Sequence, residues 1–194
     1  MALILRAADR TAVPWKNGGG LTREVAVQPP GSDFASFDWR VSLAEVRQGG
    51  PFSIFPQIDR LMAVLGGRLQ LTIADGPPVT LSAESPPCDF AGDVPAYAEP
   101  LENPVSDLNV MTRRGRCAAQ LRRCRAETSL ALPLEADATL LLALAPLSVH
   151  AAAFAASLAP LDALRFGAEP GGRVTAARAG AALDVWLIGI RAHL

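Results

Sequence analysis

The segment FDWRVSLA (residues 37–44) alternates large apolar side chains with polar or small ones. Because successive side chains of a β-strand point to opposite faces, this alternation predicts a half-buried strand. The segment LQLTI (residues 69–73) repeats the pattern, with leucine or isoleucine at every second position. Turn signals rich in glycine and proline lie around these segments, at residues 49–51, 66–67, 75–78, 86–87 and 171–172. Amphipathic helix patterns are scarce, so the sequence predicts an all-β sandwich or barrel.

A weak internal repeat refines this prediction. The segments LMAVLGGRL (residues 61–69) and LLLALAPLSV (residues 140–149) each contain an apolar strand, a turn and a second strand. Each is followed by a turn-rich segment with an aromatic residue and then by a late strand, at residues 88–93 and 108–111 in the first half and 164–169 and 185–188 in the second. Two tandem β-barrel modules of one design, residues 1–126 and 127–194, explain the repeat.

The composition excludes several classes of protein. The chain has 194 residues, of which 50% are hydrophobic and 19% charged, and its net charge is −1. This hydrophobic content suffices for a core and argues against a disordered chain. The near-zero net charge argues against a nucleic-acid-binding protein. Residues 1–124 carry 13 of the 18 basic and 13 of the 19 acidic side chains, so we expect polar chemistry in the first module and mainly scaffold in the second.

Three further features bear on the cellular compartment. The cysteines, Cys88, Cys117 and Cys124, are too few and too widely spaced for a disulfide framework, so we expect reduced thiols. The N-terminal segment has no signal-peptide pattern, which predicts a cytoplasmic protein. Residues 138–161 contain no acidic or basic side chain apart from one histidine. Two prolines and several polar residues interrupt them, so we predict strands and a turn rather than a membrane helix.

The segment WKNGGGLTRE (residues 15–24) is the most unusual in the chain, because it holds the single lysine, Lys16, followed by Asn17 and three glycines. Glycines let the backbone approach a ligand closely or adopt positive φ. One interpretation is an anion-binding loop that uses Lys16, Asn17 and backbone N–H groups as donors. The alternative is a plain glycine turn that leads into a strand.

Polar residues also occur on the strand that begins near residue 37. Arg40 and Ser42 share the face opposite the large apolar side chains, and this face lines the interior if the sheet forms part of a barrel. Glu45 falls on the apolar face. A carboxylate there either emerges into water at the strand end or pairs with an arginine such as Arg60 or Arg23.

Two further segments carry candidate binding residues. Residues 50–60 (GPFSIFPQIDR) combine aromatic side chains with Ser53, Asp59 and Arg60, a pattern typical either of a barrel mouth or of a hydrophobic plug with a surface ion pair. By alternation, Asn109, Met111 and Arg113 share a face. An inward-pointing Arg113 predicts a bidentate clamp on a carboxylate, whereas an outward one is simply solvated.

The histidine content argues against metal chemistry. His150 and His193 are the two histidines of the chain, and neither belongs to a metal-ligand motif. We therefore expect no metal and no cofactor. A catalytic triad based on Ser-His-Asp or Cys-His would need His150, which lies in an otherwise apolar segment.

Five segments, taken in order, resemble the HutD/Ves family: WKNGGGLTREVAV (15–27), FDWRVSLAEV (37–46), GGPFSIFPQIDRLMAVLGG (49–67), DFAGDVP (89–95) and DLNVMTRRG (107–115). The resemblance implies a double cupin without the histidine-rich metal motifs of other cupins. It also implies a link to histidine utilisation, in which some members are thought to sense a pathway intermediate, or to a stress response. It implies no established catalytic activity.

We expect these segments to form a site in the first module for a small carboxylate such as urocanate or formylglutamate. Arginine, hydroxyl and amide donors suit the carboxylate, and aromatic walls suit a planar body. The candidate ligand-binding residues are Lys16, Asn17, Thr22, Arg23, Arg40, Ser42, Glu45, Phe52, Ser53, Phe55, Asp59, Arg60, Asn109 and Arg113.

Two other functions stay open. The first is a metal-free isomerase or lyase that uses Glu45 or Asp59 as the base and Lys16 or Arg40 as the electrophile. The second is a protein-interaction module or a homodimer whose pocket no longer binds a ligand. Neither nucleic acid nor membrane is expected as a partner.

Overall fold

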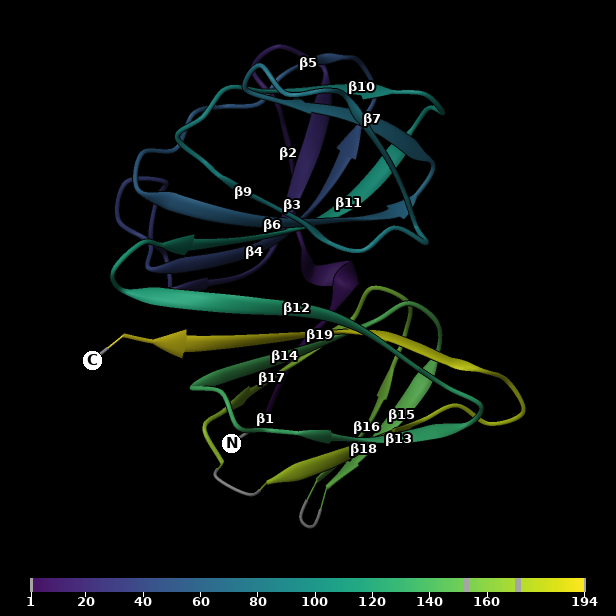
Figure 1. The fold of residues 1–194 in the computed structure, drawn as a ribbon. Coiled ribbons are helices and arrows are strands. Elements are labelled where there is room, and N and C mark those ends of the chain that lie inside the picture. Colours follow the sequence, from purple (N-terminus) through teal and green to yellow (C-terminus); the bar gives the residue numbers. More distant parts are fainter. Residues whose placement is uncertain (1, 152–153, 170–171, 194) are drawn as a thin grey trace. The chain divides into compact units, whose positions relative to one another are not determined.

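The computed structural model of the chain describes residues 2–151, 154–169 and 172–193. Among them, regular structure consists of strands and one short 3₁₀ helix, Ala7–Asp9, so the all-β prediction is confirmed. The chain forms two compact units (Figure 1). The first contains Thr11–Ala118, and the second contains Ala119–Ala192 together with the N-terminal segment that ends at Arg10.

The first unit consists of a six-stranded and a four-stranded sheet. The larger sheet has the order β2 (Ala12–Pro14), β3 (Gly20–Gln28), β4 (Trp39–Val46), β11 (Val105–Arg113), β6 (Ile58–Gly66) and β9 (Cys88–Ala91). The smaller sheet has the order β5 (Gly50–Pro51), β10 (Ala96–Pro100), β7 (Arg68–Ile73) and β8 (Val79–Ser82). Neighbouring strands of the unit pair in the antiparallel sense.

The second unit has the same design. Its five-stranded sheet has the order β1 (Ala2–Leu5), β17 (Ala163–Gly167), β14 (Ala138–Ala143), β19 (Leu183–Ala192) and β12 (Cys117–Ala126). Its four-stranded sheet has the order β13 (Ser129–Pro133), β18 (Arg173–Ala177), β15 (Leu147–Ala151) and β16 (Phe154–Leu158). The order β12-β19-β14-β17 corresponds to β4-β11-β6-β9, and β13-β18-β15-β16 corresponds to β5-β10-β7-β8, as the internal repeat predicts.

The observed division of the chain differs in two respects from the predicted boundary between residues 126 and 127. The division falls eight residues earlier, within β12. In addition, the first ten residues belong to the second unit, because β1 pairs with β17 in the antiparallel register Ala2 to Phe166 through Leu5 to Ala163. Pairing between segments so distant in sequence leaves no local signal in either of them.

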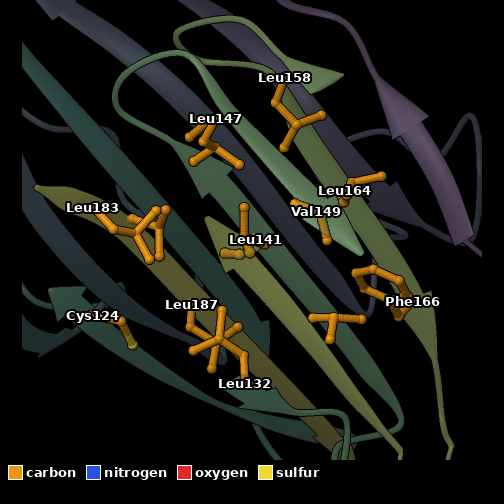
Figure 2. Close-up of a cluster of buried hydrophobic side chains, with 14 of the residues drawn as sticks. Cys124, Leu132, Leu141, Leu147, Val149, Leu158, Leu164, Phe166, Leu183 and Leu187 are labelled. Atoms are coloured by element: carbon orange, nitrogen blue, oxygen red, sulfur yellow. The ribbon is translucent and has the colours of Figure 1, made fainter. Parts of the chain in front are cut away.

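Each unit buries an apolar core between its two sheets. In the first unit, Val46, Met62 and Val64 of the larger sheet pack with Leu69 and Leu71 of the smaller one. Figure 2 shows the corresponding cluster of the second unit, in which leucines from both sheets, among them Leu132, Leu141 and Leu187, meet around Val149 and Phe166.

The uncharged segment 138–161 forms strands, as predicted. It contains β14, β15 and β16, and the turn at Pro146 separates the first two. A search of the described residues for a helix long and apolar enough to cross a membrane finds none.

Candidate functional site

The inner face of the six-stranded sheet is the face that packs against the four-stranded sheet. Val46 of β4, Met62 of β6 and Val105 of β11 identify it, because their side chains belong to the core between the two sheets. Residues two positions apart on a strand share a face, and directly opposed residues on neighbouring strands do as well. The register therefore assigns each paired position of the sheet to one face.

Six polar side chains occupy the middle of the inner face, and we call them the polar belt. They come from β3, β4, β6 and β11 and comprise Glu24, Arg40, Ser42, Arg60, Asp107 and Asn109. Ser42 lies opposite both Glu24 and Asn109 in the register. One apolar cluster, with Val27, Ile58 and Met111, lies toward one end of these strands, and the Val46 and Met62 cluster lies toward the other.

Arg60 is the buried cation of the belt, with 7% of its surface exposed. Its guanidinium lies between two aromatic rings, 4.7 Å from the centroid of Phe52 and 4.9 Å from that of Phe90. One terminal nitrogen donates a hydrogen bond of 2.7 Å to Oδ1 of Asn109. Burial lowers the pKa of Arg60 to about 10, against the opposing effect of the Asp107 charge, so the side chain stays cationic at neutral pH.

Asp107 is the buried anion of the belt and is 1% exposed. Its Oδ1 accepts a hydrogen bond from Nδ2 of Asn109. Burial raises its pKa to about 6, although the Arg60 charge and the Asn109 hydrogen bond act in the opposite direction. Within the described part of the chain, neither Oδ2 of Asp107 nor Nε of Arg60 has a hydrogen-bond partner.

Arg40 and Glu24 form a second, more exposed pair in the belt. Nε of Arg40 lies 2.9 Å from a carboxylate oxygen of Glu24, and their side chains are 13% and 43% exposed. The Arg40 guanidinium lies 4.9 Å from the centroid of the exposed Phe34 ring. Phe34 in turn stacks on Phe55, with 5.3 Å between the ring centroids. The belt therefore has a buried section at Arg60 and Asp107 and a more accessible one at Glu24.

Several predicted residues do come together here. Arg40, Ser42, Arg60 and Asn109 belong to the belt, and Phe52 covers the Arg60 guanidinium. Others near the interior have structural contacts instead. The hydroxyl of Thr22 accepts the indole N–H of Trp15 at 2.8 Å. Phe55 packs beside Ile58 and Met111.

Arg113 does not form the expected carboxylate clamp. Its Nε donates to the carbonyl of Phe37 at 2.9 Å, and its Nη2 donates to the carbonyl of Ala35 at 2.8 Å. These bonds fix the segment that precedes β4. The planar guanidinium serves two main-chain acceptors in place of a ligand carboxylate.

Three other predicted residues lie on the opposite face of the sheet. Arg23 and Glu45 stand opposite Leu43 and Leu21 in the register and alternate with belt residues. Asp59 precedes Arg60 on β6 and pairs with the exposed Arg114 at 2.7 Å. The predicted burial of Glu45 is partial, with a quarter of its side chain exposed. Its partner, at 2.6 Å, is Arg47 rather than Arg60 or Arg23, because the strand end turns this carboxylate toward a neighbouring loop residue.

This arrangement also bears on the predicted catalytic groups. Glu45 and Asp59, the expected bases, lie on the face opposite Arg40, one expected electrophile. Lys16, the other expected electrophile, is exposed. The candidate binding residue Ser53 is exposed as well. Glu45 and Asp59 therefore do not share a face of the sheet with Arg40.

The glycine-rich segment forms a turn that leads into a strand. The N–H of Gly18 bonds to the carbonyl of Trp15 at 3.0 Å, and the N–H of Gly19 bonds to Oδ1 of Asn17 at 3.0 Å. The carbonyl of Gly19 accepts from the N–H groups of Arg47 and Gln48. Two of the expected donors are therefore used within the protein, and the segment closes the hairpin of β2 and β3.

We expect the substitution Gly20→Ala to lower the free energy of unfolding by about 1–3 kcal/mol, the usual cost of overpacking. A Cβ at this position would overlap the carbonyl oxygen of Glu45 and would lie 3.1 Å from the Trp15 ring. Urea denaturation measures the loss. Gly50→Ala is the matched control, because its Cβ would meet only the Asn17 side chain at 3.7 Å. Equal stability of the two variants would contradict the expected clash.

Three residues of the site were not among the predicted ones: Glu24, Phe90 and Asp107. Asp107 had a signal, since it precedes Asn109 by two positions and so shares the face of Asn109 and Met111. Glu24 had only a weak signal, because an irregular register between Glu24 and Ala26 interrupts the alternation on β3. Phe90 had none, since its position opposite Arg60 depends on the pairing of β6 with β9.

The described residues contain no group of three or more histidine, cysteine, aspartate or glutamate side chains placed to hold a metal ion. His150 and His193 are both exposed. The three cysteines are free. Burial raises the pKa of the Cys88 and Cys117 thiols, which is typical of packed rather than reactive cysteines.

Known proteins are similar to this chain in sequence, and solved structures are similar to it in fold. Protein Ves from Cronobacter sakazakii is 39% identical over 109 residues, which cover 56% of this chain and 59% of that protein. A 21.2 kDa protein from the hutC 3′ region of Pseudomonas putida is 32% identical over 119 residues, which cover 61% and 62%. The matched stretches thus span less than two thirds of either relative.

Solved structures are similar to this chain over all or nearly all of its length. A conserved protein of unknown function from Pseudomonas aeruginosa PAO1 superposes with a TM-score of 0.90 at 28% identity over 98% of this chain and 99% of that one. HutD from Pseudomonas fluorescens SBW25 superposes with a TM-score of 0.83 at 24% identity, with full coverage of both chains. A cupin 2 conserved barrel domain protein from Leptotrichia buccalis, with a TM-score of 0.61 at 9% identity over 92% of each chain, shares the fold alone.

The sequence pattern of one family extends over both units. The HutD family model matches residues 7–183 and so includes the polar belt as well as most of the second unit. The chain therefore belongs to the HutD family.

Proposed function

We propose that this protein binds a small carboxylate at the polar belt of its first unit and that it acts by this binding in histidine utilisation, as a sensor of an intermediate such as urocanate or formylglutamate. The family name and the hutC 3′ region of the Pseudomonas putida relative support the pathway. A cytoplasmic protein with a small molecule as its partner, rather than nucleic acid or membrane, fits this role.

The observation that carries the proposal is the state of Arg60. A buried guanidinium is costly unless it is paired, yet among the described residues Arg60 donates its hydrogen bond to a neutral amide. Two aromatic rings hold it in place, so little side-chain freedom is lost when an anion binds. Charge-assisted hydrogen bonds to a carboxylate are about twice as strong as neutral ones. The same rings offer apolar walls to a planar ligand body.

The test is isothermal titration of the protein with urocanate and with N-formylglutamate, supported by thermal unfolding. A ligand present at about 100 times its Kd adds about 2.7 kcal/mol to the free energy of unfolding. We expect binding by the wild type and a loss of affinity of at least about tenfold in Arg60→Met, because a charge-assisted hydrogen bond is removed. Arg60→Lys keeps the charge but lacks the planar donors, so it should recover binding only in part.

Arg68→Met is the matched control, because Arg68 lies on β7 of the four-stranded sheet, is more than half exposed and pairs with Glu102. It should bind like the wild type. If the wild type binds neither carboxylate, the proposal fails and an interaction module becomes the better interpretation. If Arg60→Met binds as tightly as the wild type, the assignment to the belt fails.

A further inference from the structure

Asp107 ends a hydrogen-bond chain that runs in one direction across the belt. Arg60 donates to Oδ1 of Asn109, and Nδ2 of Asn109 donates to Oδ1 of Asp107. Both ends of the Asn109 amide are used, so its orientation is fixed by its two neighbours. One amide group therefore separates the buried cation from the buried anion.

This spacing is unlike that of a structural ion pair. An arginine and an aspartate buried for stability alone gain most from direct bidentate contact, because two parallel hydrogen bonds compensate both desolvated charges. Here the amide keeps the two groups apart. One donor, Nε of Arg60, and one acceptor, Oδ2 of Asp107, have no partner among the described residues. Buried polar atoms are nearly always hydrogen-bonded. The unpaired donor of Arg60 and the unpaired acceptor of Asp107 therefore indicate that partners for both are missing from the described part of the chain.

From this geometry we infer that Asp107 determines which carboxylate the site accepts, because its Oδ2 receives a hydrogen bond from an N–H or O–H group of the ligand. The ligand class is then a small acid with two groups: a carboxylate for Arg60 and, a few bonds away, a hydrogen-bond donor for Asp107. This inference rests on the proposed function. It goes beyond that function by adding a requirement that a carboxylate alone does not meet.

The requirement follows from the cost of an unpaired charge. Oδ2 of Asp107 is already buried without a partner among the described residues, so an acid with a donor relieves this cost and an acid without one leaves it in place. Sites built to hydrogen-bond a substrate group discriminate far more strongly against analogues that lack it than apolar pockets do against a missing methylene. Asp107 lies on the same inner face as Arg60, and Asn109 connects the two by hydrogen bonds, so the inference requires one small molecule to contact both groups.

The experiment compares two planar acids of nearly the same shape. Urocanate carries an imidazole N–H beside its acrylate, and 3-(2-furyl)acrylate replaces the imidazole with a furan, which has no donor. Titration of the wild type at pH 7.5 should show at least about tenfold tighter binding of urocanate. N-formylglutamate and its ester analogue 2-(formyloxy)glutarate, in which N–H becomes oxygen, form a second matched pair.

The variant Asp107→Asn tests the residue itself. It keeps the shape of the side chain, but its amide can donate as well as accept, so the preference for the N–H ligand should fall at least about fivefold. Asp107→Leu removes the acceptor and should abolish the preference. Asp89→Asn, at an exposed carboxylate on β9, should keep the wild-type preference.

The outcomes separate this inference from the proposed function. Equal binding of both members of each pair by the wild type overturns the inference, as does an unchanged preference in Asp107→Asn. If Arg60→Met still loses affinity in either case, the proposed function stands without it. If the wild type binds none of the four acids, both fail.

Discussion

Replacing Asp162 with alanine will lower the free energy of unfolding of the second unit by about 2–4 kcal/mol, because a buried carboxylate with several charge-assisted hydrogen bonds is lost. Asp162 is 3% exposed. It accepts hydrogen bonds from the N–H of Ala7 and from Arg6, both at 2.7 Å, and from the N–H of Ala159 at 3.0 Å. The variant leaves these donors without their partner and releases the segment that follows β1.

The pH dependence of this loss identifies its cause. Burial raises the pKa of Asp162, but the hydrogen bonds from Ala7, Arg6 and Ala159, together with the Arg6 charge, outweigh burial and hold the pKa below its ordinary value of 3.8. A lowered pKa of an acid means that its contribution to stability is complete above the ordinary pKa and disappears as the pH falls through the folded-state pKa. Urea denaturation should therefore show the full gap between wild type and variant at pH 7 and a smaller one at low pH.

Asp59→Ala is the control, because Asp59 pairs with Arg114 on the surface, where both side chains are about half exposed. It should unfold almost like the wild type. A loss in Asp162→Ala that does not exceed the loss in Asp59→Ala would show that the N-terminal segment is held by other contacts.

Alternation and repetition were sufficient to predict the architecture. Trp39, Val41 and Leu43 are buried on one face of β4, as their spacing predicts, and the two apolar segments of the repeat became β6 and β14 at equivalent places in their sheets. The position of β1 could not be predicted in this way. Its apolar residues indicate a strand, but its partner β17 lies more than 150 residues away, and a short strand does not specify where it pairs.

The candidate site was predictable where it depends on strand faces. Arg40, Ser42 and Asn109 reach the interior because they alternate with residues of known orientation. Alternation did not give the face of Arg23, which depends on the irregular register of β3, or the partners of Arg113, whose donors meet main-chain carbonyls of a loop. Alternation assigns a side chain to a face. It does not tell which neighbour receives its hydrogen bonds, because that depends on tertiary packing.

The substitution Arg60→Met should destabilise the first unit by about 3–5 kcal/mol at pH 8, the usual cost of leaving a buried charge uncompensated. The loss should be much smaller near pH 5. The reason is that the Asp107 charge, which Arg60 compensates from across the Asn109 amide, disappears on protonation. Protonated Asp107 needs no cation beside it.

The direction in which stability changes with pH follows from the pKa of Asp107, which burial raises to about 6 from 3.8. Between these values the folded protein binds more protons than the unfolded chain, so this group makes stability fall as the pH rises. The Arg60 charge lowers the Asp107 pKa. Its removal therefore raises that pKa further, and the fall in stability continues to a higher pH in Arg60→Met than in the wild type.

Urea denaturation between pH 5 and pH 8 measures the two profiles, and the carboxyl ¹³C resonance of Asp107 reports the titration directly. The double variant Arg60→Met, Asp107→Asn is the control, since it removes both charges and keeps the shape of Asp107. Its stability should lose the part of the pH dependence that belongs to Asp107, and at pH 8 it should be more stable than Arg60→Met alone, because no uncompensated carboxylate is buried. A loss in Arg60→Met that is the same at pH 5 and pH 8 would mean that the methionine disturbs the packing between Phe52 and Phe90, and that Arg60 does not stabilise the Asp107 charge.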